Sequence, residues 1–143
     1  MTRPEPPRRL FVDTAVLAYA LGGEHAMRGP CRALLEAAAR GDVELHASVE
    51  MVQELLHHRL RRGDRAAAVA QARGAAAACV LHPFDADVLA RAVDLVEQAG
   101  LGGRDAVHAA TALQHGFAAL VSPDRDFDAV PGVERLDPGR LTL

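Results

Sequence analysis

Residues 103–127 read GRDAVHAATALQHGFAALVSPDRDF, and this stretch decides the fold that we expect. Apolar residues recur at helical spacing from Ala106 to Leu113, which predicts a helix with one buried face. Gly116 follows as a left-handed cap, a conformation that glycine adopts without steric cost. Residues 117–121 form a short apolar run, typical of a strand that is buried on both faces. The stretch therefore predicts a helix, a tight turn and an inner strand of an α/β protein.

Acidic residues flank both of these elements. Asp105 falls in the first turn of the expected helix, where a carboxylate suits the positive end of the helix dipole. Asp124 and Asp126 come directly after the expected strand, behind Ser122 and a proline that stops it. In open α/β sheets, binding sites form at the carboxyl ends of strands. Other acids in comparable positions are therefore candidates for the same site.

Asp13 and Glu54 are the best further candidates. Asp13 follows an expected strand at residues 10–12, where it is either the N-cap of the next helix or a site residue. Glu50 and Glu54 lie four residues apart on a helix that Ser48 caps, so they share a face and repel each other unless solvated, paired or bridged by a cation. Solvation is the simpler account of Glu50, and Glu54 is the better candidate for a buried functional carboxylate.

Glu54 is preferred because it lies nearer the expected apolar stripe of this helix. That stripe comprises Val49, Val52, Leu56 and Leu60.

The remaining chain continues the alternation of strands and helices. We expect strands at residues 10–12, 43–47, 79–81, 117–121 and 133–136. This order predicts an α/β fold, in which a parallel sheet is covered by helices on both faces. Residues 1–9, rich in proline and arginine, are expected to be a loose lead-in, and residues 10–143 a single domain.

Composition points to a protein of the cytoplasm. Half of the 143 residues are hydrophobic but only 3% are aromatic, so we expect a core built on close helix packing. No apolar run approaches the roughly 18 residues of a membrane span, and no signal-peptide pattern is found. Cys31 and Cys79 are isolated in apolar surroundings, which favours buried free thiols over a disulfide.

Arginine is the only strongly basic residue of the chain. The formal charge is -3, and all 16 basic residues are arginine. Arginine binds phosphate in bidentate fashion, but the use of arginine in place of lysine is also explained by a coding bias toward GC-rich codons. Arg59, Arg61 and Arg62 lie in a cluster that is either a solvated helix end or a patch that contacts phosphates. Arg104, beside Asp105, is a weaker candidate for the same role.

The acids suggest a metal site. Asp13, Glu54, Asp105 and Asp124, gathered within a few ångström, would repel one another and could not all stay ionised without a cation. Hard oxygen ligands favour Mg²⁺ or Mn²⁺ over Zn²⁺. Such an ion orients a water, lowers its pKa and offsets the charge of a phosphodiester under attack. The seven histidines have no zinc spacing, and for His108 a packed or hydrogen-bonded role is preferred to a catalytic one.

Four short segments together carry a resemblance to a known family. They are FVDT at residues 11–14, the helix start at residues 48–54, GRDAVHAATA at residues 103–112, and VSPDRDF at residues 121–127. The ordered set resembles a PIN-domain protein, most closely the VapC-like toxins of prokaryotic toxin–antitoxin pairs. The resemblance covers the chain from Phe11 to about Asp137.

The resemblance implies a three-layer α/β/α sandwich with a parallel sheet of four or five strands. It also implies a Mg²⁺- or Mn²⁺-dependent endoribonuclease that forms a homodimer and is neutralised by a small antitoxin. Asp13, Glu54, Asp105 and Asp124 match the family's acids, and Asp126 matches a frequent fifth acid that supports the metal. Thr14 and Ser122 match small hydroxyl residues that orient the acids.

Three other functions are compatible with an α/β fold that carries acids at strand ends. A signalling receiver domain needs an acidic pair after its first strand and a lysine near its last, and this chain has neither. A PIN-fold nuclease with a housekeeping role in RNA processing stays open from sequence alone. A non-catalytic binding module, in which the acids only cap helices, is disfavoured because all four acids are present.

Overall fold

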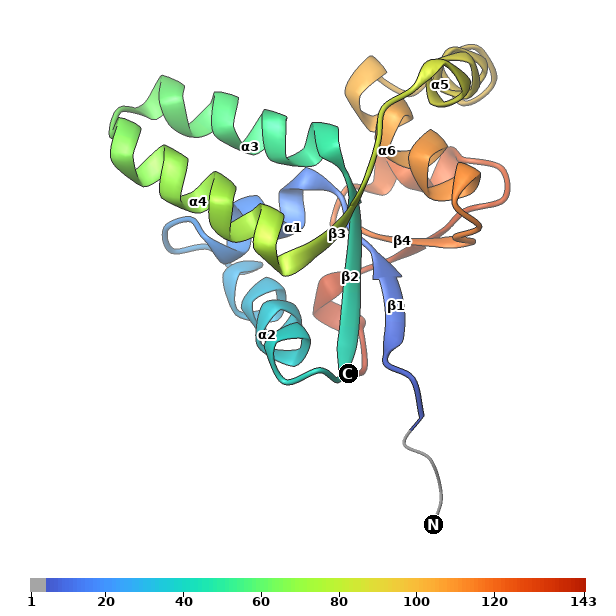
Figure 1. Ribbon diagram of the computed structural model, residues 1–143. Helices are drawn as coiled ribbons and strands as arrows, with labels where there is room; N and C mark the ends of the chain where they lie inside the picture. The colour runs from blue at the N-terminus through green and yellow to red at the C-terminus, as the bar shows by residue number, and fades with distance from the viewer. Residues whose placement is uncertain (1–4) are drawn as a thin grey trace.

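A computed structural model describes residues 5–143 and shows helices on both faces of a parallel sheet (Figure 1). The strands are β1 (Arg8–Phe11), β2 (Val43–Ser48), β3 (Cys79–His82), β4 (Ala119–Val121) and β5 (Glu134–Leu136). The helices are α1 (Thr14–Ala20), α2 (Arg28–Ala39), α3 (Val49–Arg62), α4 (Arg65–Ala78), α5 (Ala86–Ala99) and α6 (Gly103–Gln114). Two short 3-10 helices follow, η1 (Arg125–Ala129) and η2 (Pro138–Arg140). The expected three-layer α/β/α architecture is confirmed.

An isolated parallel bridge joins the two parts of the sheet. Strands β1, β2 and β3 form one parallel ladder, and β4 and β5 form another. A parallel bridge between Val12 and Val121 places β1 beside β4, so the strands run in the order β3-β2-β1-β4-β5. The carboxyl ends of β1 and β4 therefore meet at one edge, as the sequence predicted.

The sheet separates two apolar cores. Leu10 and Val12 of the first strand region point toward α1, α2 and α3, where Leu17, Leu34 and Leu55 are buried. On the other face Phe11 packs with residues of α5, α6 and η1. Alternate side chains of one strand thus enter opposite cores, as expected for an inner strand covered on both faces.

Polar caps start the helices next to the strands. The N–H of Ala15 donates to the Asp13 carboxylate, and the N–H of Glu50 donates to Ser48 Oγ. Gly116, with a φ of 79°, turns the chain after α6 in the left-handed conformation that the sequence predicted. These caps fix the position at which each strand ends and each helix begins.

Two strand limits differ from the expectation. Strand β1 begins at Arg8, so Arg8 and Arg9 pair with Val43 and Glu44 and are not part of a loose lead-in. Residues 1–4 of that lead-in lie outside the described residues. Strand β4 begins at Ala119, because residues 116–118 complete the turn after α6.

The expected buried face of α3 is wrong. Met51 and Leu55 are fully buried in this helix, whereas Val49 and Leu60 are each 37% exposed. The side chains of Val52 and Leu56 are half-buried. Met51 and Leu55 belong to the core that also contains residues of β1 and β2, so the packing of α3 against the sheet decides which face is buried. Leu55 directly follows Glu54, so the buried face lies still closer to that acid than expected.

Both cysteines are free thiols, as predicted. Burial raises the pKa of Cys31 to about 11 and that of Cys79 to about 12, so neither thiol is a ready nucleophile at neutral pH. Within residues 5–143, no helix is both long and apolar enough to cross a membrane.

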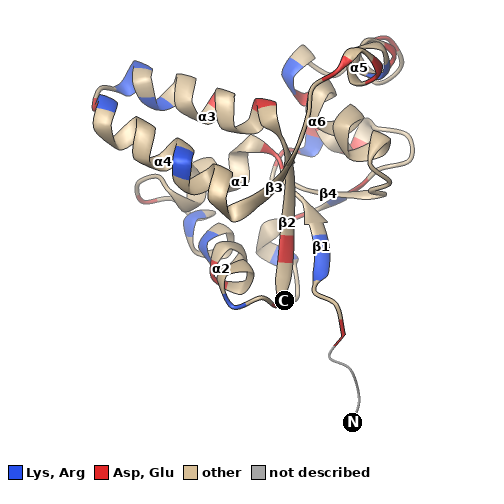
Figure 2. Ribbon diagram, in the orientation of Figure 1, with Lys and Arg blue, Asp and Glu red and all other residues tan. Residues whose placement is uncertain are grey.

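Charge is unevenly distributed over the fold. Figure 2 shows basic residues gathered where α3 ends and α4 begins, and acidic residues where α3 approaches the sheet. The long α3–α4 pair thus carries its positive charge away from the strand ends (Figure 1).

Replacement of Leu55 by alanine tests the corrected face of α3. Leu55→Ala should lower the free energy of unfolding by about 2–5 kcal/mol, because it leaves a cavity in the core. Leu60→Ala, on the same helix, should cost well under about 1 kcal/mol because its side chain already contacts solvent. Urea titration of both variants decides the point, and equal losses would restore the predicted face.

Candidate functional site

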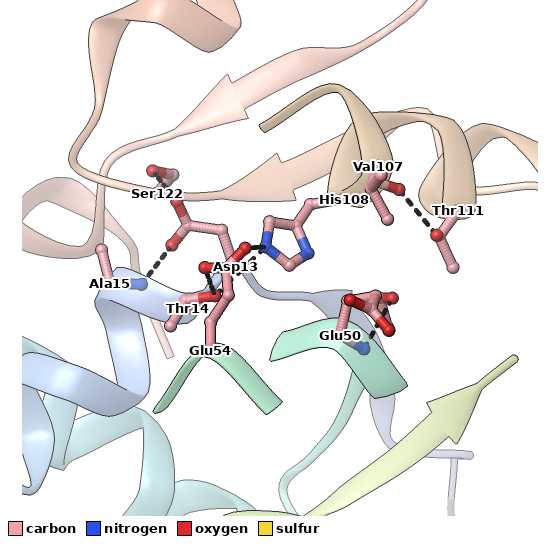
Figure 3. A network of polar contacts seen from close by, with 10 residues as sticks. Asp13, Thr14, Ala15, Glu50, Glu54, Val107, His108, Thr111 and Ser122 are labelled. Carbon is pink, nitrogen blue, oxygen red and sulfur yellow. Dashed lines mark hydrogen bonds and ion pairs between the residues drawn. The ribbon is translucent and has the colours of Figure 1, made fainter. Parts of the chain in front are cut away.

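A pocket of about 220 Å³ opens where β1 and β4 end. It is lined by Asp13, Thr14, Ala15, Ala18, Glu54, His58, Asp105, His108 and Asp124. These residues come from the start of α1, from α3, from α6 and from the loop after β4. All four predicted acids therefore converge on one pocket (Figure 3 shows part of it).

Asp13 is both a helix cap and a member of the pocket. Its Oδ1 accepts the N–H of Ala15 at 3.0 Å, and its Oδ2 accepts the hydroxyl of Ser122 at 2.7 Å. The residue is 4% exposed, and burial raises its pKa to about 6 even though Ser122 and His108 oppose the rise. The nearby Asp105 adds to the increase. Asp13 thus caps α1 and lines the pocket at the same time.

Ser122 ties two strand ends together. Its buried Oγ donates to Asp13 and accepts the N–H of Asp124 at 3.0 Å. One hydroxyl therefore sets the position of both acids, one after β1 and the other after β4. This geometry is the one expected of a small hydroxyl residue that orients carboxylates.

Glu54 is held by two partners from other helices (Figure 3). The Thr14 hydroxyl donates to Glu54 Oε2 at 2.8 Å, and His108 Nε2 lies 3.2 Å from Oε1. Burial alone would raise the pKa of Glu54, but the hydrogen bond and attraction of His108, the Thr14 hydrogen bond and the charge of Arg104 together lower it. Glu54 is therefore an ionised carboxylate at neutral pH.

His108 is a buried hydrogen-bonding residue, the role preferred from the sequence. Its side chain is 1% exposed, and Nε2 lies 3.1 Å from Thr14 Oγ1 as well as close to Glu54. Because Thr14 gives its own proton to Glu54, Nε2 of His108 must carry the proton that both oxygens accept. Its Nδ1 is buried without a hydrogen-bond partner among the described residues.

Asp105, Asp124 and Asp126 form a candidate metal centre. One oxygen from each lies within 4.8 Å of the others. Burial raises the pKa of Asp105, and Asp124 raises it further, with smaller contributions from Glu54 and Asp126. A cation among these carboxylates would relieve that repulsion, and a set of oxygen donors suits Mg²⁺ or Mn²⁺.

Asp13 stands apart from this group of three. It was expected to be a fourth ligand, but both of its oxygens already accept hydrogen bonds. Each carboxylate oxygen has a second lone pair, so these bonds do not prevent metal binding.

Three of the four predicted arginines lie near the pocket, and Arg61 does not line it or the groove beside it. Arg59 and Arg62 line a groove beside the pocket, and Arg104 is close enough to Glu54 to lower its pKa. Arg61 is exposed on α3 and is not among the described residues that line that groove or the pocket. On a helix, adjacent residues point about 100° apart, so Arg61 and Arg62 diverge.

His58 is a pocket residue that the sequence reasoning missed. It lies four residues after Glu54 on α3, so the two side chains share one helix face. That spacing was the available signal. The absence of zinc spacing among the seven histidines says nothing about such a contact with a carboxylate.

Known proteins are similar to this chain over most of its length. The PIN domain family model matches residues 10–133. Ribonuclease VapC7 of Mycobacterium tuberculosis (strain ATCC 25618 / H37Rv) is 38% identical over 132 residues, covering 90% of this chain and 91% of its own. VapC ribonuclease Mb1869c of Mycobacterium bovis is 32% identical over 130 residues, covering 89% and 98%.

Solved structures share the fold. VapBC2 from Rickettsia felis, bound to a DNA fragment from its promoter, superposes with a TM-score of 0.72 at 18% identity, covering 90% of this chain and 98% of the other. Mycobacterium tuberculosis VapC20, a Sarcin-Ricin loop cleaving toxin, gives a TM-score of 0.70 at 22% identity, covering 84% and 93%. At these identities the likeness establishes the fold alone.

Removal of the Ser122 hydroxyl should destabilise the protein in a pH-dependent way. With EDTA present, Ser122→Ala should lower the free energy of unfolding at pH 7.5 by about 1–3 kcal/mol, because the buried Asp13 carboxylate loses a donor. The loss should shrink toward pH 5, because the pKa of Asp13 is about 6 and its carboxyl is protonated below that value.

Thr111→Val is the matched control for this experiment. The buried Thr111 hydroxyl donates to the Val107 carbonyl within α6 and faces no ionisable partner in that bond. Its loss should therefore cost the same at both pH values. A Ser122→Ala cost that is equally independent of pH would contradict the link to Asp13.

Proposed function

The chain belongs to the PIN-domain family, and we propose that it is a divalent-metal-dependent endoribonuclease that acts as the toxin of a toxin–antitoxin pair. The VapC ribonucleases that it resembles over nine-tenths of its length support this function. The observation that carries the proposal is the convergence of Asp105, Asp124 and Asp126, whose oxygens lie within 4.8 Å of one another. Asp105 and Asp124 line a pocket that Asp13 and Glu54 also line.

We assign Asp105, Asp124 and Asp126 as the primary holders of Mg²⁺ or Mn²⁺, with Asp13 completing the acidic pocket. When bound, such an ion supplies a water of lowered pKa and offsets charge on the phosphate. The oxygen donors and the raised pKa of Asp105 support a hard divalent cation at this place.

Glu54 is the proposed proton acceptor. It is ionised at neutral pH, and Thr14 and His108 hold both of its oxygens in place. Thr14 and His108 are positioning residues, and Ser122 has the same role toward Asp13 and Asp124. A carboxylate that is held in one orientation can receive a proton from an attacking water without reorganising.

The RNA backbone requires cations beside this acidic pocket. We assign Arg59 and Arg62, which line the adjacent groove, and Arg104, which lies in the first turn of α6 next to Asp105. Arginine suits phosphate because its planar group donates two parallel hydrogen bonds. The two free cysteines fit a protein that works in a reducing cytoplasm.

Two protein partners are proposed. Solved toxin–antitoxin complexes with this fold support a small antitoxin as one of them. The second is another copy of the chain. Leu89, Val93 and Val96 expose apolar side chains along one face of α5, and an exposed apolar stripe of this kind marks an interaction surface.

Asp105→Asn tests the ribonuclease proposal. Cleavage of single-stranded RNA in Mg²⁺ should fall at least about a hundredfold, because the metal centre loses a charged ligand. In EDTA the variant should melt at or above the temperature of the wild type, because repulsion from Asp124 and Glu54 disappears. Addition of Mg²⁺ should then stabilise the wild type but not the variant.

Asp87→Asn is the matched control for charge. Asp87 is an exposed aspartate in the first turn of α5, as Asp105 is in the first turn of α6. This variant should cleave RNA like the wild type. Full activity of Asp105→Asn would refute the assignment of the site.

Val93→Glu tests the proposed homodimer. Val93 is 60% exposed on the apolar face of α5, and a buried charge there would separate the two copies. Light scattering should give twice 15.2 kDa for the wild type and 15.2 kDa for the variant. Glu97→Gln, on the same helix, should leave the dimer intact. A monomeric wild type at about 50 μM would argue against the dimer, because stable dimers have much lower dissociation constants.

A further inference from the structure

A groove of about 560 Å³ continues from the catalytic pocket. It is lined by Ala15, Ala18, Tyr19, Gly22, Gly23, Glu24, His25, His58, Arg59 and Arg62. Three of these residues, Ala15, Ala18 and His58, also line the pocket itself. The two hollows therefore share a wall. A chain whose phosphate lies among the catalytic acids can continue into the groove.

Tyr19 and His25 form a fixed aromatic pair in this groove. Their ring centroids lie 4.4 Å apart with an interplanar angle of 21°, so the rings stack. The N–H of Met27 donates to His25 Nδ1 at 3.1 Å, which fixes the orientation of the ring in its own plane. His25 is nevertheless exposed, and Tyr19 is half-buried beneath it. An exposed ring held in this way is preorganised to stack with another ring.

Arg59 is also held in position. Its Nε donates to Gln71 at 2.6 Å and its NH2 donates to the Ala18 carbonyl at 2.8 Å, which leaves further N–H groups for a ligand. Gly22 permits this arrangement. A Cβ atom there would lie 2.7 Å from the Ala18 oxygen and 3.4 Å from Arg59 NH2.

The charges of the two hollows are opposite. Acids dominate the lining of the pocket, whereas Arg59 and Arg62 outnumber the one acid, Glu24, among the described residues of the groove. Figure 2 shows the same change of sign along α3. A polyanion that reaches the acids meets repulsion there, so favourable binding energy must come from such adjacent cations.

We propose that this groove binds the single-stranded RNA next to the scissile phosphate, with one base stacked on His25 and the flanking phosphates facing Arg59 and Arg62. The proposal rests on the ribonuclease function proposed above and adds a substrate subsite to it. Stacking tolerates any base, because every base has a π-face. The groove therefore selects single-stranded RNA without selecting its sequence.

The test measures RNA binding without cleavage. A fluorescein-labelled oligouridylate of about 12 nucleotides is titrated with the full chain carrying Asp105→Asn, in EDTA. A second probe has the same backbone with abasic sites in place of the bases. His25→Ala in this background should weaken binding of the first probe by about tenfold and leave the second unchanged. His25→Phe should restore binding to within about threefold, because the ring is retained.

Arginine variants distinguish the contribution of charge to RNA binding from that of base stacking. Arg62→Ala should weaken both probes alike and reduce the slope of log Kd against log salt by about one. His57→Ala and Arg61→Ala are the matched controls, because both residues are exposed on α3 but do not line the groove. Both controls should bind like the parent.

The outcomes that overturn the proposal are distinct from failure of the ribonuclease assignment. An unchanged affinity in His25→Ala, or an equal loss on both probes, would refute the stacking site even if Asp105→Asn abolishes cleavage. Failure of the oligonucleotide to bind, or unchanged affinity in all groove variants, would also refute the RNA subsite. The groove would then be a candidate binding site for a protein partner instead.

Discussion

The parallel pairing of β1 with β4 is the constraint on which the site depends. The N–H of Asp13 donates to the Val121 carbonyl at 3.3 Å, next to the bridge between Val12 and Val121. This contact joins the two ladders and brings Asp13 beside Ser122, which follows β4. The Ser122 hydroxyl then reaches Asp13 at 2.7 Å and orders Asp124. If this pairing slipped by one residue, the acids after the two strands would no longer meet.

The same arrangement places carboxylates close enough to repel one another. Burial raises the pKa of Asp13 to about 6, and burial together with the neighbouring acids raises the pKa of Asp105. Glu54 differs because His108 and Thr14 stabilise its ionised form. The pocket thus contains carboxylates in two electrostatic states. We propose that the acids with raised pKa values take up a cation and that Glu54, which protein donors hold in its ionised form, accepts a proton.

The strands, the parallel sheet and the positions of the acids could be predicted from the sequence, because each depends on a short local pattern of residues. Apolar runs between caps located each strand, and the alternation of strands and helices predicted the parallel sheet. The acids stood at strand ends and helix starts, which are the site positions of such sheets. The buried face of α3 could not be predicted, since it depends on how the helix packs against β1 and β2. Contacts between distant segments were also out of reach, such as Arg59 with the Ala18 carbonyl and His108 with Glu54.

The most direct test of the account is the position of a bound metal. Crystals soaked in Mn²⁺ can be measured at a wavelength where manganese scatters anomalously. We expect an anomalous peak among the carboxylates of Asp105, Asp124 and Asp126, at the approximately 2.2 Å that separates such an ion from oxygen ligands. A peak elsewhere, or none at a Mn²⁺ concentration that supports RNA cleavage, would contradict the proposed metal centre.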